Sequence, residues 1–219
     1  MNISKNTLSV LSNFASINQN ILIKPGNVLS TRTVAKNIYV EATVEDSFDQ
    51  QFGVYNLNEL IGIISLFSDP TFEVSQNTLT ISQGKNKVKY IFASPEVLDY
   101  PDKPIKMPDY DAKFELSEEN LKSLIKAGAV LSASDLLISG NGQTIMCTVL
   151  DPKNPSSNTF SIDVGDTDRV FSGYIKLESL KLPSGIYDVF LSSKKITHFK
   201  NKTMKYSFYV ANEKNSSWA

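Results

Sequence analysis

"YPDKPIKMPDYDA", residues 100–112, lies near the middle of a chain of 219 residues and decides how the rest is divided. Pro101, Pro104 and Pro108 remove backbone donors and favour extended conformations at the residues before them. Such a segment is typical of an extended tether, close to polyproline II, and not of a compact turn. We therefore expect a folded unit on each side of it.

The first half predicts a helix, strands, a second helix and more strands. Ser4 is a good N-cap, and Leu8, Leu11 and Phe14 follow the three-four spacing of one helical face. Strand-like runs rich in β-branched and aromatic residues follow: "NVLSTRT", "KNIYVEATV" and "QQFGVYN". The second helix, "NLNELIGIISLF", begins after Asn56, and three strands then lead to residue 93.

The second half repeats this order. After the short strand "KFEL", the segment "SEENLKSLIKAGAV" predicts a helix capped by Ser117, with two acids in its first turn. Four strands, a short helix in "KLESLKL" ended by Pro183 and Gly185, and three further strands complete the pattern. The repetition indicates an α+β chain with one domain used twice, at residues 1–99 and 113–219, joined by a linker at 100–112.

Composition limits the class of protein. Hydrophobic residues make up 41% and charged residues 21%, which is typical of a globular chain with a packed core. The longest apolar run, residues 60–67, is too short to span a bilayer, and the polar N-terminus is no signal peptide. One cysteine, Cys147, fits a reducing compartment. The net charge of −1 means that any contact with nucleic acid depends on where the lysines lie.

Several stretches resemble a known family. They are "LSVLSNFASINQNILIK" with "TRTVAKNIYVEA", "YNLNELIGIISL", "DKPI", "VGDTD" and "YIKLESLKLPSGIYDVFL". In this order they resemble the sliding clamps, or DNA polymerase processivity factors, of large tailed phages and, more distantly, proliferating cell nuclear antigen. The resemblance runs from the N-terminus to about residue 210.

The resemblance implies a sliding-clamp fold and a homotrimeric ring, with helices lining the hole and curved antiparallel sheets forming the rim. It implies a non-catalytic protein that encircles duplex DNA without sequence preference and tethers the replicative DNA polymerase. It also implies a clamp loader as partner, no cofactor, no membrane, and the cytoplasm of the infected host cell. A role in transcription stays open.

The faces of the helices give the candidate DNA contacts. We expect them to be Lys5, Ser9, Ser12, Asn13, Lys122, Lys126, Lys176 and Lys181. Lys122 and Lys126 form a like-charge pair one turn apart, which Glu118 and Glu119 can offset locally. The alternative is that all these lysines are ordinary solvated residues. The second helix departs from the pattern, because it has no lysine and contains Glu59.

Two further sites follow from the resemblance. Partner peptides of clamps dock near the tether and the C-terminal strand, where the candidates are Tyr100, Ile105, Met107, Tyr209 and Val210. The alternative is that Ile105 and Met107 only pin the tether to the sheets. Subunits would meet through strand edges at Lys87, Val88, Tyr90, Phe92, Thr159, Phe160 and Ile162. The tail that contains Trp218 has no assignment.

Enzyme and metal sites have little support. We expect Cys147 to be buried and His198, the one histidine, to be half-exposed, and a catalytic pair would require them to meet in space. The "DVGDTD" segment at 163–168 lacks the ligand spacing of a calcium loop and predicts an ordinary turn. The rival function is a duplicated β-rich phage structural protein without DNA contact, and a hydrolase with an unrecognised site is a third. Salt dependence of DNA association would separate the first two.

Overall fold

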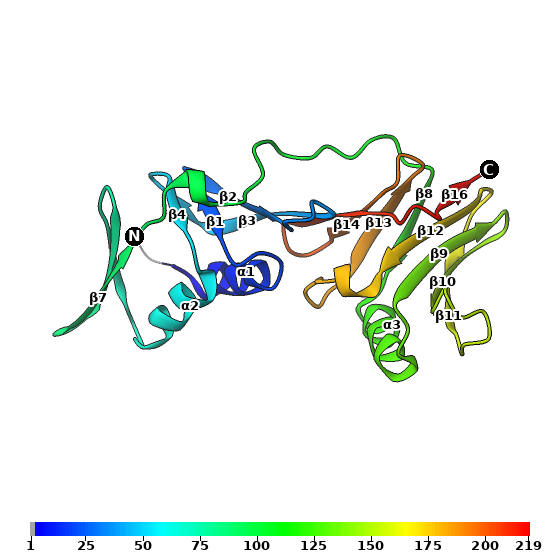
Figure 1. The fold of residues 1–219 in the computed structure, drawn as a ribbon, viewed down its shortest axis with the longest axis horizontal. Helices are drawn as coiled ribbons and strands as arrows, with labels where there is room; N and C mark the ends of the chain where they lie inside the picture. The colour runs from blue at the N-terminus through cyan, green and yellow to red at the C-terminus, as the bar shows by residue number, and fades with distance from the viewer. Residues whose placement is uncertain (1–2) are drawn as a thin grey trace. The chain divides into compact units, whose positions relative to one another are not determined.

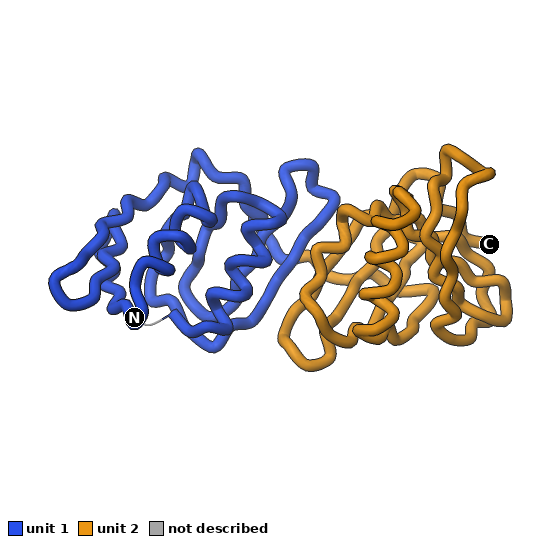
Figure 2. The backbone as a smooth tube through the Cα atoms, turned by 90° about the horizontal axis from the view of Figure 1, so that it is seen from below, with its two compact units in different colours: residues 1–104 blue, residues 105–219 orange. Residues whose placement is uncertain are grey.

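A computed structural model describes residues 3–219 and divides the chain into two compact units, residues 1–104 and 105–219 (Figure 2). Each unit combines antiparallel sheets with few helices, which confirms the predicted α+β class. No helix in the described range is long and apolar enough to cross a bilayer.

Over its described residues, 3–104, unit 1 has two α-helices and seven strands (Figure 1). They are α1 (Lys5–Ala15), β1 (Ile21–Ile23), β2 (Gly26–Arg32), β3 (Ile38–Phe48), β4 (Phe52–Val54), α2 (Leu57–Ser65), β5 (Thr71–Val74), β6 (Thr78–Gln83) and β7 (Asn86–Ile91), followed by the 3-10 turn η1 (Pro95–Val97). The strands pair antiparallel as β1 with β4, β2 with β3, and β5-β6-β7 in that order.

The core of unit 1 lies where the two helices meet the strands. Val10, Leu11 and Phe14 are the buried stripe of α1, and α2 buries Leu57, Leu60 and Ile64 at the same kind of spacing. The helices contact each other, and α1 also contacts β3, in which every second side chain is buried along most of the strand. The predicted caps are confirmed, since the side chains of Ser4 and Asn56 accept hydrogen bonds from the first turns.

Unit 2 has one α-helix and a larger share of strands. They are β8 (Ala112–Leu116), α3 (Glu118–Leu131), β9 (Asp135–Asn141), β10 (Thr144–Leu150), β11 (Phe160–Asp166), β12 (Val170–Lys176), the 3-10 turn η2 (Leu177–Ser179), β13 (Tyr187–Ser192), β14 (Ile196–Asn201), β15 (Tyr206–Ala211) and β16 (Ser217–Trp218). One sheet has the order β11-β10-β9-β12-β16, and in another β15, β14, β13 and β8 are neighbours. Helix α3 packs against β10 and β11.

The predicted fourth helix is wrong, because residues 176–182 contain only the three-residue turn η2. Strand β12 continues to Lys176, and the backbone N–H of Leu177 donates to the carbonyl of Ser134 at 3.0 Å. The Leu177 side chain lies against the backbone of α3 at Gly128, where a Cβ atom would come within 2.7 Å of it. These contacts fix the chain before a full helical turn can form.

The proline-rich segment contains no helix or strand between η1 and β8, and each of its ends is anchored in its own unit. In unit 1, Asp99 accepts from the guanidinium of Arg32 at 2.8 Å, and its backbone N–H donates to Asn20 Oδ1. In unit 2, the Asp111 backbone N–H donates to the carbonyl of Leu191 at 2.7 Å. The tether thus begins and ends at fixed points.

Candidate nucleic-acid interface

Helix α1 presents a polar face beside its buried stripe. Lys5, Ser9 and Ser12 are exposed, and Asn13 is half-buried. The Ser12 hydroxyl donates to the carbonyl of Leu8 at 2.8 Å, so towards a ligand it can act only as an acceptor. Lys5 has no ion pair within residues 3–219 and lies in the first turn, which contains no acid. No acidic side chain of residues 3–219 therefore competes with a phosphate for its ammonium.

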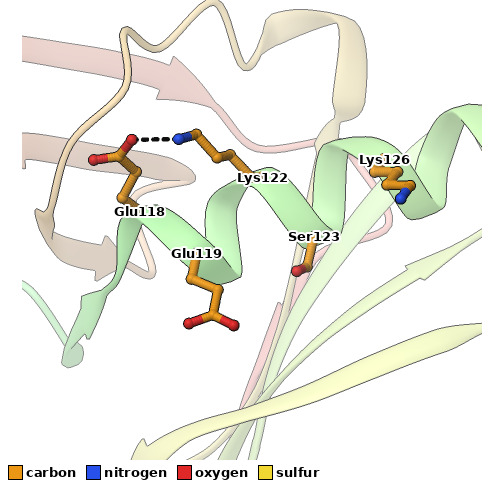
Figure 3. A pocket seen from close by; sticks show the side chains of 5 residues that line it. All are labelled: Glu118, Glu119, Lys122, Ser123 and Lys126. Atoms are coloured by element: carbon orange, nitrogen blue, oxygen red, sulfur yellow. Dashed lines mark hydrogen bonds and ion pairs between the residues drawn. The ribbon is translucent and has the colours of Figure 1, made fainter.

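Helix α3 has the two other exposed lysines of the candidate face. Figure 3 shows Glu118 and Lys122 facing each other across one turn, whereas Glu119 and Ser123 point to a different side. The Lys122 ammonium lies 2.5 Å from the Glu118 carboxylate, and the two side chains are 64% and 42% exposed. The predicted local compensation of the Lys122 charge is confirmed for Glu118. Lys126 has no ion pair in the described part of the chain.

An open hollow of about 450 Å³ runs along α3, bordered on one side by Glu118 and Lys122 and on the other by Glu119 and Ser123 (Figure 3). Its lining is Glu118, Glu119, Lys122, Ser123 and Lys126. A hollow that is open along a helix suits contact with an extended surface better than enclosure of a small ligand, and its two lysines and two glutamates leave the lining without net charge. Helix α2 adds no attraction, since its exposed charge is Glu59.

Lys176 is placed differently from the other candidates. Its ammonium lies 2.8 and 2.9 Å from the two carboxylate oxygens of Asp135, whose side chain is only 1% exposed. The hydrogen bond that Lys176 donates to Asp135 raises the pKa of Lys176 above its usual value. The Ser134 hydroxyl also donates to Asp135. Lys176 therefore neutralises a buried carboxylate, and little of its charge is left for DNA. Lys181 is exposed and follows η2.

The candidate peptide-docking residues fall into two groups. Tyr100, in unit 1, is half-buried, and the Lys24 ammonium lies 5.6 Å from the centre of its ring. In unit 2, the Ile105 side chain is 38% exposed and Met107 is half-buried. Tyr209 and Val210 belong to β15 and are 8% and 1% exposed. The ring of Tyr209 stacks on His198 at 4.2 Å. Val210 therefore belongs to the core, and a peptide could reach its side chain only if the sheet opened.

The candidate subunit-interface residues lie at two strand edges. Strand β7 ends the sheet β5-β6-β7, and β11 ends the five-stranded sheet of unit 2, so within residues 3–219 each has one edge without a neighbouring strand. Lys87 on β7 is exposed and Val88 half-buried, whereas Tyr90 packs inward at 8% exposure. Phe92, directly after β7, stacks on Phe52 at 4.6 Å. On β11, Phe160 is 37% exposed and Ile162 half-buried, and Thr159 is exposed just before the strand.

An apolar groove beside β11 is missing from the sequence-based prediction. It has a volume of about 350 Å³ and lies between α3 and the start of β11. Val130, which is 73% exposed, and Phe160 contribute to its lining together with Ala127 and Leu131. The sequence indicates this groove only weakly. Val130 is apolar like the buried residues of α3, and only its position on a different side of the helix from Leu121 and Leu124 predicts that it is exposed.

The structure gives no support to nucleophilic chemistry at Cys147 or His198. Cys147 is buried in β10, as predicted, and burial raises the pKa of its thiol to about 12, so the thiol stays protonated at neutral pH. His198 lies in β14, which belongs to a different sheet, and is 8% exposed; the prediction that it is half-exposed is wrong. Residues 163–166 extend β11, and the predicted turn is confined to residues 167–169. In the described range, no three acidic, histidine or cysteine side chains cluster as metal ligands.

The duplicated α+β units have the architecture of DNA clamps. Over 96% of each chain, the structure superposes with a TM-score of 0.71 and 14% identity on the A. fulgidus PCNA that was solved with the C-terminal region of FEN-1. Residues 4–97 match the family model for DNA polymerase processivity factors.

The relatives in sequence are phage proteins. The chain is 30% identical to the sliding clamp of Enterobacteria phage T4 over 202 residues, which are 89% of this chain and 88% of that protein. It is 28% identical to the sliding clamp of Vibrio phage KVP40 over 221 residues, which are 97% and 99% of the two chains. The chain belongs to the sliding-clamp family of DNA polymerase processivity factors.

Proposed function

We propose that this chain forms a ring around duplex DNA and tethers a replicative DNA polymerase for processive synthesis, without catalysing a reaction itself. The observation that supports this function is the collinear similarity to the sliding clamp of phage T4 along 88% of that protein. The rival function, a β-rich structural protein without DNA contact, is not favoured, because the family model describes DNA polymerase processivity factors and these relatives are sliding clamps.

The proposed ring is a homotrimer closed by head-to-tail pairing of β7 from one copy with β11 from the next. The exposed side chains of the two strands have opposite charge, with Lys87 and Lys89 on β7 and Asp163 and Asp166 on β11. The apolar groove beside β11 would bury further surface in this contact. Pairing of two different edges is heterologous and gives a closed ring when the rotation between copies fits.

The hole of the proposed ring is lined by α1 and α3. Lys5 and Lys126 supply most of the attraction, because Lys122 is paired with Glu118 and Lys176 with Asp135. Ser9 and Ser12 add neutral polar contacts, and Lys181 and Asn13 lie at the margin of this proposal. A ring holds DNA by topology, so a few weak phosphate contacts are enough, and stronger ones would hinder sliding.

Peptide segments of the polymerase and of a clamp loader are the proposed partners of unit 2 near the tether. The A. fulgidus PCNA is bound to the C-terminal region of FEN-1, which is a precedent on the same fold. Ile105 and Met107 are the accessible apolar side chains for such a contact, whereas Tyr209 is buried and would take part only after a local rearrangement. We place the protein in the cytoplasm of the infected host cell; a transcription partner and the contribution of Tyr100 stay predictions.

The native mass tests the ring. Light scattering at several concentrations should give about 73 kDa, the mass of three chains of 24.3 kDa each. A mass of one chain at all concentrations would contradict a ring that closes without help, and a mass of two or four chains would contradict a trimer.

The topological hold on DNA has its own test. Because a ring can thread over a free end, an open end of linear duplex DNA should allow both loading and loss of the protein. Blocking both ends of a biotinylated duplex with streptavidin should abolish new loading and, for rings already loaded, should prevent loss. Retention that does not change when the ends are blocked would show ordinary surface binding and contradict the clamp mechanism.

A further inference from the structure

The last residues of the chain fold back on the edge of β12. In β16, Ser217 lies opposite Ser172 and Trp218 lies opposite Phe171 (Figure 1, red). The backbone N–H of Ala219 donates to the carbonyl of Val170 at 3.0 Å. The tail is therefore an added strand, which the sequence alone did not predict.

Side-chain and backbone contacts extend this pairing towards the start of the tail. The Tyr174 backbone N–H donates to the Ser216 hydroxyl at 2.9 Å, and the Glu213 N–H donates to the Tyr174 carbonyl at 2.8 Å. Ser216 is only 7% exposed, although it is three residues from the end of the chain. The edge-facing groups of β12 at Val170, Ser172 and Tyr174 are thus covered along most of the strand.

Strand β12 needs such a cover more than other strands at the ends of sheets. Its sequence "VFSGYIK" is rich in β-formers, contains no proline, and has a single charge at its end, which is the composition that pairs readily with another chain. A two-residue terminal strand, by contrast, offers almost no edge for pairing.

Other terminal strands have protection of their own. Strand β5 has four residues and follows Pro70. Strand β8 alternates buried residues with Lys113 and Glu115, and the start of β2 is distorted by an irregularity between Gly26 and Val28. Charges, short length and bulges are the usual means by which edges avoid unwanted pairing. Only β12 is covered by a separate piece of chain among these strands of residues 3–219.

We propose that residues 213–219 are an edge cap that prevents β12 from pairing with a second copy of the chain. The cap leaves β7 and β11 as the edges available for association, and so it directs assembly towards one kind of contact. This last step rests on the proposed ring, whereas the protection of β12 does not. Without the cap, β12 edges of two copies would pair and link rings, or single chains, into larger species.

The test compares the intact protein with a chain that ends at Asn212. Light scattering across a range of concentrations should show a mean mass at least about twofold higher for the shortened chain, since pairing through β12 joins two assemblies. The matched control is Ser172→Pro in the shortened chain. The backbone groups of Val170 and Tyr174 face the tail, and Ser172 lies two residues from each, so its N–H faces the same side. Proline at position 172 therefore removes a donor from the exposed edge and not from the ladder with β9. The control should return the mass to that of the intact protein.

Ser217→Pro in the full-length chain releases the tail without shortening it. Trp218 is the one tryptophan of the sequence, so its fluorescence reports release directly by a shift to longer wavelength. We expect this variant to gain mass as the shortened chain does, and circular dichroism should show retained strands in both. It also provides the test if the shortened chain does not fold.

The outcomes separate the edge cap from the ring. A released Trp218 with unchanged mass in Ser217→Pro would overturn the cap, whatever the mass of the intact protein. Larger species that Ser172→Pro does not reverse would show association through another surface and would also overturn it. If the intact protein is not a trimer but the variants still gain mass in a Ser172-dependent way, the ring fails and the cap stands.

Discussion

Helices α1 and α3 are the first helices of the two units, and they agree in what they bury and differ in what they expose. Each begins after a serine whose hydroxyl accepts from the backbone N–H three residues on, at 3.2 Å for Ser4 and 3.1 Å for Ser117. Each buries an apolar stripe against strands. On the exposed side, α1 has an unpaired Lys5, whereas in α3 Glu118 holds Lys122. The duplicated positions are those that packing requires, and the exposed positions are free to set the charge.

The second helical element differs more. Unit 1 has α2 with nine residues, whereas unit 2 has the three-residue turn η2. The segment of unit 2 is held instead by the ion pair between Lys176 and the buried Asp135. Unit 1 thus holds its second helical element by an apolar helix face, whereas unit 2 holds its own by an ion pair. Loss of the ion pair should therefore lower the stability of unit 2 through an unpaired buried charge.

The largest effect is expected for Lys176→Met, which removes the anchor of η2. The buried Asp135 carboxylate would lose its partner, and the free energy of unfolding should fall by about 3 kcal/mol, at the low end for such pairs because Lys176 is partly exposed. Urea unfolding of the intact chain at fixed protein concentration measures this loss.

Lys202→Met is the matched control in the same unit. Lys202 also pairs with a carboxylate, that of Glu115, but both side chains are exposed, and such pairs contribute little to stability. We expect an unfolding midpoint close to that of the unchanged protein. Equal losses for the two variants would show that burial of Asp135 is not what makes the Lys176 pair important, and the comparison with α2 would fail.

The ion pair between Lys176 and Asp135 also illustrates why part of the fold is predictable from the sequence and part is not. The caps at Ser4, Asn56 and Ser117 and the apolar stripes are local patterns, and they located α1, α2 and α3. The fourth helix was wrong because contacts from Ser134, Asp135 and Gly128, all distant in sequence, override the local helical pattern of "KLESLKL". Burial of Val210 and pairing of the tail with β12 likewise depend on neighbours that no local pattern names.

A smaller effect is expected from mild acid, and it should act first on unit 2, because His198 is the one histidine of the sequence. Burial, with a lesser contribution from Lys200, lowers the pKa of His198 to about 4. The neutral ring is stacked between Phe190 and Tyr209. Since the folded pKa lies below the unfolded value of 6.5, the stability contributed by His198 is present above pH 6.5 and is lost as the pH falls towards 4.

Unfolding at pH 7 and pH 4.5 measures this loss, which we expect to be about 2 kcal/mol from the width of the pKa shift. His198→Phe keeps an aromatic ring in the stack and cannot titrate, so it should remove most of the difference between the two pH values. Hydrogen exchange should show that β14 loses protection on acidification before α1 does. Acid sensitivity that persists in His198→Phe, or that appears first in unit 1, would contradict this assignment.

The smallest effect concerns the charge difference between α1 and α3. Glu118→Gln frees Lys122 from its ion pair, so the exposed face of α3 would gain a second unpaired lysine beside Lys126. An exposed pair of this kind is worth only a few tenths of a kcal/mol, so DNA association should strengthen about twofold at low salt, with a steeper dependence on salt concentration.

Glu119→Gln provides the matched control, because it removes the same charge from the same turn. Glu119 has no ion pair within residues 3–219, and its side chain points to a different side of the helix (Figure 3). If the ion pair of Lys122 is what weakens the attraction between α3 and DNA, Glu118→Gln should increase both the affinity for DNA and its salt dependence more than Glu119→Gln does. If the two variants behave alike, the general charge of the helix sets the attraction, and the contrast with Lys5 on α1 has no specific role. A clamp that must slide gains from weak contacts, so the variant with the stronger attraction should also diffuse more slowly along DNA.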